Sequence, residues 1–422
     1  MAKLFQDIIG YDNVKKSLER ILDVLNHREK YLKIGSTIPH GLFLYGPPGL
    51  GKSTFALDLL KYVENRTTYI VRKNKSDGEF MNYVTDIFKE AKEKQPSIIL
   101  LDDLDKFSEE DSEICNNEEF VTIQSLIDNI KNDDVFVVAT ANNKHILPSS
   151  LLRAGRFDIK IKIDYPTEEE ALKIFKYYLK KKKVDENVNI KNISYILGCS
   201  SCADLEKVCN QAGLYAGFHN KKEIGLEEIL RASLELAYDT NIEECLEDDE
   251  YSIQVAYHEA GHALIGELLE HGSISFITIA KTDSDTRGFT KYHTNDNYFY
   301  DIQFMENRIL SLLAGKAAID IVFHKCDIGS KSDIERAYKI AERFIDQYCM
   351  FGFDSYLDEY DCHSDKLIQS KNDRVIELLT KYYNKVKEKL IANRHILDHL
   401  ATKLEEKKIL FQDEIRNTIY NS

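Results

Sequence analysis

The chain has 422 residues, of which 43% are hydrophobic and 30% are charged, and its formal net charge is -15. This composition excludes extensive disorder and predicts about three globular domains at roughly 150 residues each. The acidic balance excludes a general electrostatic attraction to nucleic acid or anionic lipid, so we expect no nucleic-acid partner.

The sequence also gives no signal for export or membrane insertion. No run approaches the ~20 apolar residues that a membrane-spanning helix needs, and residues 1–10 lack the apolar core of a signal peptide. The eight cysteines are scattered, as is typical of a reducing compartment, so we expect a cytoplasmic protein. Cys199 and Cys202 have C-x-x-C spacing without a second pair, which favours a helix start over a structural zinc site.

The first third of the chain alternates short apolar runs with helical segments. This alternation predicts a parallel sheet with helices on both faces. The expected strands are 42–45, 69–71, 98–101, 135–139 and 159–163, and the expected helices include 81–94 and 120–132.

Beyond Pro166 the pattern becomes helical. The expected helices are 168–183, 190–197, 203–217 and 226–238. An acidic run then predicts a linker, and the rest is helix-rich with one strand-like run at 274–280. These changes divide the chain into four segments, which are 1–165, 166–240, 241–250 and 251–422.

The first expected strand is followed by Gly46-Pro47-Pro48-Gly49-Leu50-Gly51-Lys52-Ser53 and then by a helix. In this strand–loop–helix context the pattern predicts a phosphate-binding loop. Its glycines let backbone N–H groups surround a phosphate, and the helix N-terminus adds a favourable dipole. Lys52 brings a positive charge to the β- and γ-phosphates, and the Ser53 hydroxyl is suited to bind Mg²⁺.

Two acidic residues, Asp102 and Asp103, end the buried strand expected over 98–101. Asp102 fits the Mg²⁺-binding role, and Asp103 is placed to orient the attacking water. We expect ATP rather than GTP, because the chain contains no guanine-specifying Asn-Lys-x-Asp.

A second motif, His258-Glu259-Ala260-Gly261-His262, lies in a segment with helical periodicity. A spacing of four places both histidines on one helix face, where their imidazoles can share a tetrahedral zinc ion. Glu259 lies beside them and is suited to act as a general base. The pair His395 and His399 has the same spacing but lacks the glutamate, which favours a solvated helix face.

The third zinc ligand is not local. Ile265 and Leu268 occupy the positions where an extended metzincin motif needs glycine and histidine. A carboxylate from a later segment remains. The acidic residues that suit this role by chemistry alone are Asp283, Asp285, Asp327, Asp333 and Glu335.

These motifs resemble, in order and over nearly the whole chain, those of the FtsH-type ATP-dependent zinc metalloproteases of the AAA+ class. Residues 5–10 are similar to the segment that borders the adenine pocket in that family, which implies a nucleotide contact for Ile9. Residues 46–53 and 99–103 match its Walker A and Walker B motifs, and Thr54 continues the former.

The resemblance extends through residues 139–158, which read ATANNKHILPSSLLRAGRFD. It implies that Asn142 is the sensor on the γ-phosphate side. It also implies that Arg153 and Arg156 are arginine fingers that act on ATP in the neighbouring subunit. Residues 201–205 (SCADL) resemble a motif of the family's lid domain.

In the C-terminal half, HEAGH at 258–262 is the family's zinc helix as it stands. Residues 329–334 (GSKSDI) resemble the segment whose aspartate is the third zinc ligand, which selects Asp333. Residues 348–350 resemble the end of the same helix, and residues 287–290 resemble the edge strand along which the substrate lies.

The resemblance implies an α/β AAA+ P-loop domain with a parallel sheet and a helical lid, followed by a mostly α-helical zinc metalloprotease domain. The implied cofactors are Zn²⁺, ATP and Mg²⁺. The implied assembly is a homohexamer that drives unfolded or misfolded polypeptides into a peptidase chamber.

Several positions depart from the family pattern. The N-terminal membrane anchor is missing, so we expect either a cytoplasmic protein or the cytosolic part of a membrane-anchored parent. Asp103 replaces a glutamate, and the signalling motif expected near 131–133 is absent. Ser76 stands where the pore aromatic is expected. Phe80 lies four positions further on and is the gripping residue if the alignment is shifted by four.

The changed pore segment predicts weak unfolding of stable substrates. The alternative function is therefore a remodelling or holdase ring whose peptidase domain cuts only unfolded peptides.

Overall fold

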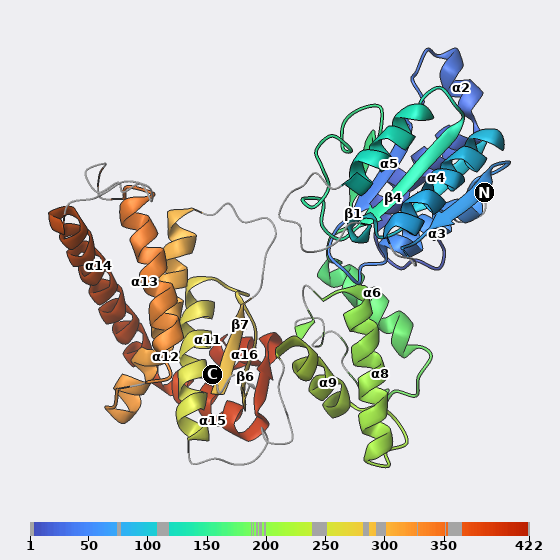
Figure 1. Ribbon diagram of the computed structural model, residues 1–422. Helices are drawn as coiled ribbons and strands as arrows, with labels where there is room; N and C mark the ends of the chain where they lie inside the picture. Colours follow the sequence, from blue (N-terminus) through green and yellow to red (C-terminus); the bar gives the residue numbers. More distant parts are fainter. Residues whose placement is uncertain are drawn as a thin grey trace. The chain divides into compact units, whose positions relative to one another are not determined.

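The computed structural model describes residues 4–73, 77–107, 118–186, 200–238, 251–281, 287–292, 301–326, 328–350 and 365–420, together with positions 188, 190, 193, 196, 197 and 352. The chain folds into two compact units (Figure 1). One contains Met1–Glu186 and Leu197–Ile224, and the other contains Asn187–Ile196 and Gly225–Ser422. In the described ranges, no helix is both long and apolar enough to cross a membrane.

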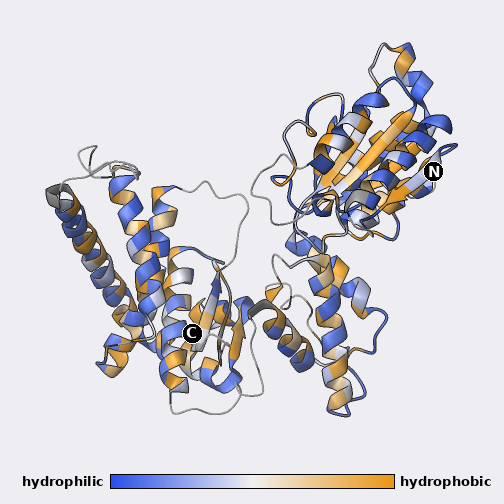
Figure 2. Ribbon diagram, in the orientation of Figure 1, coloured by the Kyte–Doolittle hydropathy of each residue, from blue (hydrophilic) through white to orange (hydrophobic). Residues whose placement is uncertain are grey.

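A five-stranded parallel sheet forms the centre of the first unit, as the alternating pattern predicts. In spatial order its strands are β2 (Thr67–Val71), β3 (Ser97–Leu101), β4 (Val135–Ala141), β1 (Gly41–Tyr45) and β5 (Ile159–Lys162). Every residue of β3 and β4 is buried, and Figure 2 shows the apolar character of the central strands. Unbroken apolar runs are expected in strands that are covered on both faces.

Helices cover the two faces of this sheet. One face carries α4 (Asp77–Glu93) and α5 (Glu118–Asn129), whose apolar side chains pack around Phe43. On the other face, α3 (Lys52–Tyr62) contacts β1 and β4 and is itself contacted by α1 (Asp12–Asn26). The short elements of this part are α2 (Arg28–Lys33) and the 3₁₀ turn η1 (Leu104–Lys106).

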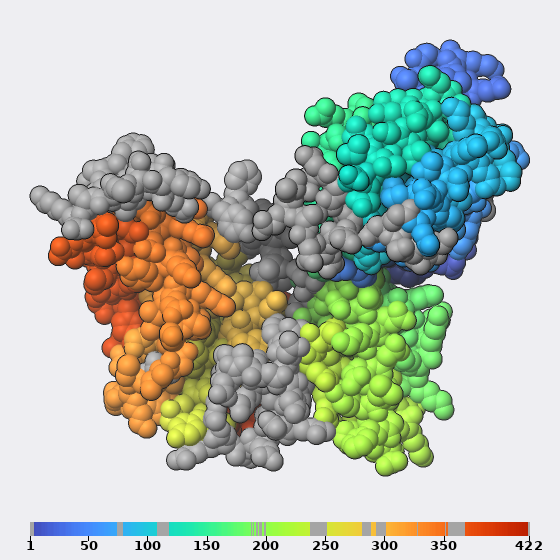
Figure 3. Space-filling model, in the orientation of Figure 1, coloured from blue at the N-terminus to red at the C-terminus, as the bar shows by residue number. Residues whose placement is uncertain are grey.

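The first unit continues with two packed helices, α6 (Glu168–Leu179) and α8 (Cys202–Phe218). Each begins with a capping box, formed by Thr167 with Glu170 and by Ser201 with Asp204, which satisfies backbone donors that would otherwise lack partners. Cys202 is therefore a helix-start residue, and Cys199 lies outside the described residues. Figure 3 shows α8 along the surface of this unit.

The second unit is mostly helical, as expected. Its helices are α9 (Leu226–Tyr238), α11 (Ser252–Leu269), α12 (Ile302–Phe323), α13 (Lys331–Asp346), α14 (Asp365–Ala392), α15 (Arg394–Lys407) and α16 (Gln412–Tyr420). Helix α11 runs through the middle, because it packs against α12, α15 and the sheet. Ten of its residues are buried, so a helix that is apolar nearly all round becomes the centre of the core.

A small antiparallel sheet completes the second unit. Its strands are β6 (Ile274–Lys281), β7 (Arg287–Tyr292) and β8 (Ile409–Phe411), in the order β7-β6-β8. Leu234 of α9 packs against Phe276 and Phe411 of this sheet. Helix α9 therefore lies in the second unit, although it precedes the boundary expected at 240. The expected linker at 241–250 lies outside the described residues, and the domain boundaries stay a prediction.

Of the two positions considered for the residue that grips the substrate, Ser76 and Phe80, the structure describes only Phe80. Ser76 lies outside the described residues. Phe80 is fully buried, and its ring packs edge-on against Phe107 with the centroids 4.8 Å apart. A side chain in this position belongs to the core beneath the sheet, so Phe80 is not available to grip a substrate.

We therefore expect Phe80→Ala to destabilise the first unit by about 3–5 kcal/mol, because it removes a ring from a closely packed core. Denaturant unfolding followed by circular dichroism measures this loss. Lys89→Ala, at an exposed position of the same helix, is the control and should change stability by less than about 0.5 kcal/mol. Equal stabilities of the two variants would contradict the burial of Phe80.

Candidate nucleotide and metal sites

The predicted phosphate loop joins β1 to the first turn of α3. Gly51 caps this helix with a φ of 82°, a left-handed conformation that favours glycine. Lys52 is the first helical residue, and its Nζ donates a hydrogen bond of 2.6 Å to the carbonyl oxygen of Pro47. Burial lowers the pKa of Lys52, and the neighbouring Asp103 opposes that shift. The lysine is thus held at the helix N-terminus, where a phosphate would bind.

Asp102, at the adjoining edge of the sheet, accepts hydrogen bonds from three side chains. It is buried, and its Oδ1 accepts hydrogen bonds of 2.7 Å from the hydroxyl groups of Ser53 and Thr140. Its Oδ2 accepts one of 2.9 Å from Nε of Arg72. The two residues predicted to bind Mg²⁺, Ser53 and Asp102, are thus in direct contact, and they provide the oxygen ligands that Mg²⁺ prefers.

The remaining polar residues of this edge follow β3 and β4. Asp103 has a φ of 57° and forms an exposed ion pair of 2.8 Å with Lys106. Asn142 follows β4, and its backbone N–H donates a 2.8 Å hydrogen bond to Oδ2 of Asp105. Because parallel strands end at one edge, the predicted water-orienting acid and the predicted sensor both lie near the phosphate loop.

A small cavity adjoins this loop at the place expected for adenine. The predicted nucleotide contacts that line it are Ile9, Leu50, Gly51 and Thr54. Its other lining residues include Tyr11, Ile174, Tyr177, Tyr178 and Cys202, from α6, α8 and the N-terminal segment. Apolar walls with a few polar groups are typical of nucleotide and other small-molecule sites.

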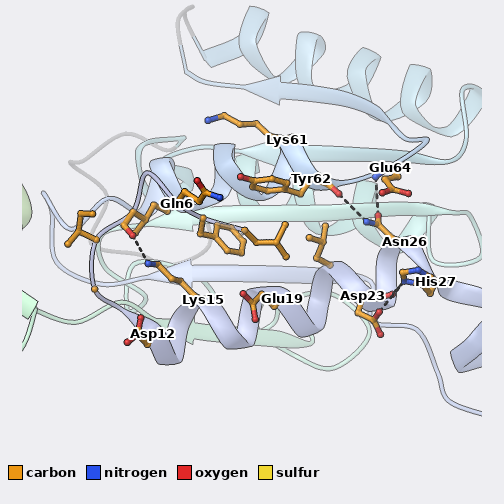
Figure 4. Close-up of a pocket in the computed structure, with 16 residues that line it drawn as sticks. Gln6, Asp12, Lys15, Glu19, Asp23, Asn26, His27, Lys61, Tyr62 and Glu64 are labelled. Carbon is orange, nitrogen blue, oxygen red and sulfur yellow. Dashed lines mark hydrogen bonds and ion pairs between the residues drawn. The ribbon is translucent and has the colours of Figure 1, made fainter. Parts of the chain in front are cut away.

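A wider groove lies on the other side of the N-terminal segment, between α1 and the end of α3 (Figure 4). Two of its polar side chains bind backbone carbonyl oxygens of the groove itself: Lys15 Nζ donates to that of Ile8, and Asn26 Nδ2 donates to that of Tyr62. Of the predicted nucleotide contacts only Ile9 reaches it. The groove therefore reflects the packing of α1 rather than the nucleotide site.

The two predicted arginine fingers differ in their surroundings. Arg153 is exposed. Arg156 is bound within its own chain, since Nε and Nη2 donate to the two carboxylate oxygens of Asp128 at 3.0 and 2.8 Å. This guanidinium lowers the pKa of Asp128 to about 2. Only Arg153 is thus presented to a neighbouring molecule without breaking an existing ion pair.

In the second unit, α11 and α13 bring three predicted metal ligands together. Nε2 of His258 and Nε2 of His262 lie 3.0 Å apart. Oδ2 of Asp333, in the first turn of α13, lies 3.4 Å from the former atom and 3.2 Å from the latter. Tetrahedral zinc with bonds of about 2.0–2.1 Å needs ligand atoms roughly 3.3 Å apart. The triangle therefore has the dimensions of a zinc site.

The surroundings of the triangle also fit a metal ion. A Cβ at Gly315 of α12 would come within 2.5 Å of His258 Nε2 and 2.6 Å of His262 Nε2, so glycine keeps this space open. Nδ1 of His262 donates to the carbonyl oxygen of Ser311 at 2.7 Å, which leaves Nε2 as the metal-binding atom. Burial acts to raise the pKa of Asp333, but hydrogen bonds from both histidines outweigh it and lower this pKa below its usual range.

Glu259 lies beside the triangle and close to the edge strand β7. It is buried, and its Oε2 accepts a 2.6 Å hydrogen bond from the Thr290 hydroxyl. Burial raises the pKa of Glu259. Gly288 of β7 has a φ of 72°, and a Cβ there would come within 3.1 Å of Glu259 Oε1. The strand backbone can thus lie directly against the glutamate.

The structure selects one of the acidic residues that the sequence alone left open. Asp333 joins both histidines, whereas Glu335 is 59% exposed and its nearest basic partner is Lys331. Asp283, Asp285 and Asp327 lie outside the described residues.

Sequence reasoning missed the supporting residues. Arg72, Ser311 and Gly315 belong to no short motif, and Thr140 lies within the 139–158 segment without a role assigned to it. Their roles depend on contacts between elements far apart in the sequence.

The fold and these two sites define a P-loop ATPase joined to a zinc peptidase, and comparison with known proteins agrees. Residues 42–165 match the ATPase family associated with various cellular activities (AAA), and residues 246–418 match Peptidase family M41.

Relatives of this chain include ATP-dependent zinc metalloproteases. An ATP-dependent zinc metalloprotease FtsH 2 from Thermoanaerobacter is 30% identical, and the alignment covers 97% of this chain and 82% of that protein. The FtsH proteins of Clostridium perfringens and Thermus thermophilus are 29% and 28% identical. Those alignments cover 99% and 98% of this chain, and 61% and 70% of the relatives. The chain belongs to the FtsH family of ATP-dependent zinc metalloproteases.

We expect Asp333→Ala to lower zinc affinity by at least about tenfold, because it removes one of three protein ligands. Zinc content per chain, measured by mass spectrometry after dialysis against a buffered zinc solution, tests this. Glu335→Ala removes an exposed acid from the same helix and should leave zinc content unchanged. Zinc loss in Glu335→Ala with retention in Asp333→Ala would overturn the ligand assignment.

Proposed function

We propose that this protein is an ATP-dependent zinc endopeptidase that degrades unfolded polypeptides. The observation that carries the proposal is the convergence of His258, His262 and Asp333 beside the buried Glu259. The alternative is a remodelling or holdase ring whose peptidase domain cuts only unfolded peptides. A complete metal triangle with an adjacent general base favours peptide cleavage as the main activity over this alternative.

Zinc held by these three ligands would polarise a scissile carbonyl and lower the pKa of a nearby water. The protein's own groups supply the rest of the reaction. Glu259 takes the proton from the attacking water and returns it to the leaving amine. The Thr290 hydroxyl holds one carboxylate oxygen of Glu259 at 2.6 Å, so the carboxylate is oriented before the substrate binds.

The substrate binds in this proposal as an additional strand along β7. This strand pairs with β6 on one side only, and it is an edge strand of the three-stranded sheet that the structure describes. Strand addition uses backbone hydrogen bonds, so it accepts many sequences but requires an extended chain. That requirement favours unfolded polypeptides.

ATP hydrolysis would occur at the sheet edge of the first unit, with Asp102 holding Mg²⁺ and Asp103 and Asn142 orienting the reacting groups. The proposed assembly is a homohexameric ring in which Arg153 and Arg156 act on the neighbour's nucleotide. Arg153 is exposed, and α8 presents Leu214 and Phe218, which are 67% and 77% exposed. Adjacent exposed apolar side chains of this kind support an interface with another molecule.

Glu259→Gln should reduce peptide cleavage by at least about a hundredfold, because the amide cannot accept the proton. Zinc content and ATP hydrolysis should stay unchanged, since the amide is nearly isosteric with the carboxylate. Cleavage of casein, with a folded protein carrying an unstructured tail assayed in parallel, measures the effect and the preference for unfolded chains. Undiminished casein cleavage in this variant would refute the zinc-peptidase proposal.

Arg153→Ala should lower ATPase activity by about a thousandfold while nucleotide affinity stays nearly constant, because a finger acts mainly on transition-state charge. Arg156→Ala should have a similar effect. Asp128→Asn is its control, since it removes the ion pair but keeps the arginine. ATPase activity that is lost equally in Arg156→Ala and Asp128→Asn would show that Arg156 acts through the fold. Full activity in a strictly monomeric protein would exclude trans-acting fingers altogether.

A further inference from the structure

We propose that Arg72 competes with Mg²⁺ for the carboxylate of Asp102 and thereby sets how strongly nucleotide binding depends on Mg²⁺. This inference rests on the proposed role of Asp102 as the magnesium-binding acid of the nucleotide site. It adds a positioning residue that no nucleotide-binding motif contains.

The backbone places Arg72 next to Asp102. Strands β2 and β3 pair in parallel with Val71 opposite Leu101, so the next residue of each strand reaches the same edge. The Asp102 N–H donates a 3.0 Å hydrogen bond to the Val71 carbonyl oxygen, which holds the two strand ends together. Arg72 thus has a fixed backbone position from which its side chain reaches the carboxylate.

The two oxygens of the Asp102 carboxylate accept hydrogen bonds from two different kinds of donor. Oδ1 accepts from the neutral hydroxyl groups of Ser53 and Thr140, which orient it toward the phosphate loop. Oδ2 receives its hydrogen bond from the Arg72 guanidinium, a permanent cation. A divalent ion bound near Ser53 and Asp102 would therefore be repelled by the Arg72 guanidinium, which is bound to the same carboxylate.

The exposure of the two partners shows which of them can move. The Asp102 side chain is 5% exposed and is fixed by three hydrogen bonds, whereas the Arg72 side chain is 57% exposed. Arg72 can therefore swing into solvent when Mg²⁺ arrives, while the carboxylate stays in place. In the absence of Mg²⁺, the same guanidinium offsets part of the cost of burying a charged carboxylate.

The expected effect follows from the charges. A guanidinium and a metal ion that share one carboxylate repel each other, and a divalent ion is repelled about twice as strongly as a unit charge at the same distance. Removing Arg72 should therefore tighten nucleotide binding in Mg²⁺ by about three- to tenfold, and change it by less than about twofold in EDTA.

Equilibrium binding of a non-hydrolysable fluorescent ATP analogue tests the proposal without measuring activity. The ratio of the dissociation constant in EDTA to that in saturating Mg²⁺ should be about three- to tenfold larger in Arg72→Gln than in the parent. Arg72→Lys keeps the charge and should stay near the parent ratio. Arg20→Gln, which removes an exposed arginine from α1, should leave the ratio unchanged.

A double variant shows whether the effect passes through Asp102. In an Asp102→Asn background, Arg72→Gln should no longer alter the ratio, because the shared carboxylate charge is gone. Weaker binding of Arg72→Gln in both EDTA and Mg²⁺ would make Arg72 a phosphate ligand and overturn the proposal. If binding to the parent depends on Mg²⁺ but Arg72→Gln leaves the ratio of dissociation constants unchanged, the Arg72 proposal is overturned and the nucleotide-site assignment stands. If nucleotide binding to the parent does not depend on Mg²⁺, both the Arg72 proposal and the assignment of the nucleotide site are overturned.

Discussion

The close approach of α11 and α12 is the contact on which the peptidase site depends. A Cβ at Gly261 would lie 2.7 Å from the Ala314 carbonyl oxygen, so the two helices meet at this distance only because the residue is glycine. Gly315 provides the matching space on α12, directly over the histidine nitrogens. With the helices this close, the Ser311 carbonyl reaches Nδ1 of His262 and fixes the ring. A larger residue at Gly261 or Gly315 would separate the ligands from the groups that orient them.

The first unit achieves a comparable convergence with strands instead of helices. Parallel pairing of β1, β3 and β4 brings the phosphate loop, Asp102 and Asn142 to one sheet edge. Asp102 accepts hydrogen bonds from Ser53 after the phosphate loop, from Thr140 of β4 and from Arg72 after β2, and so links these three segments. Both sites therefore hold a buried carboxylate by hydrogen bonds: Asp102 accepts three, and Glu259 accepts one from Thr290. Such a carboxylate is costly to bury unless its hydrogen bonds are satisfied, so its orientation is narrowly defined.

Predictions from the sequence succeeded where local pattern and chemistry coincide. The five parallel strands follow from apolar runs separated by helices, and the helical second unit follows from its periodicity. Phe80 shows the limit of such reasoning. An alignment shifted by four would make it the gripping residue, and only its packing against Phe107 in the core excludes that alternative. Helix α9 shows the same limit, since only the partner of its apolar face decides the unit to which it belongs.

The sequence by itself determined the parallel-sheet ATPase fold, the phosphate loop and the spacing of His258 and His262, because each depends on neighbouring residues along one element. Asp333 was selected among chemically equivalent acids only by its resemblance to family members. Tertiary structure alone decided that Asp333 meets both histidines, that Arg72 binds Asp102, and that Arg156 is tied to Asp128. These pairs join residues that are distant in the chain. Their geometry depends on how whole elements pack, and no local periodicity encodes that.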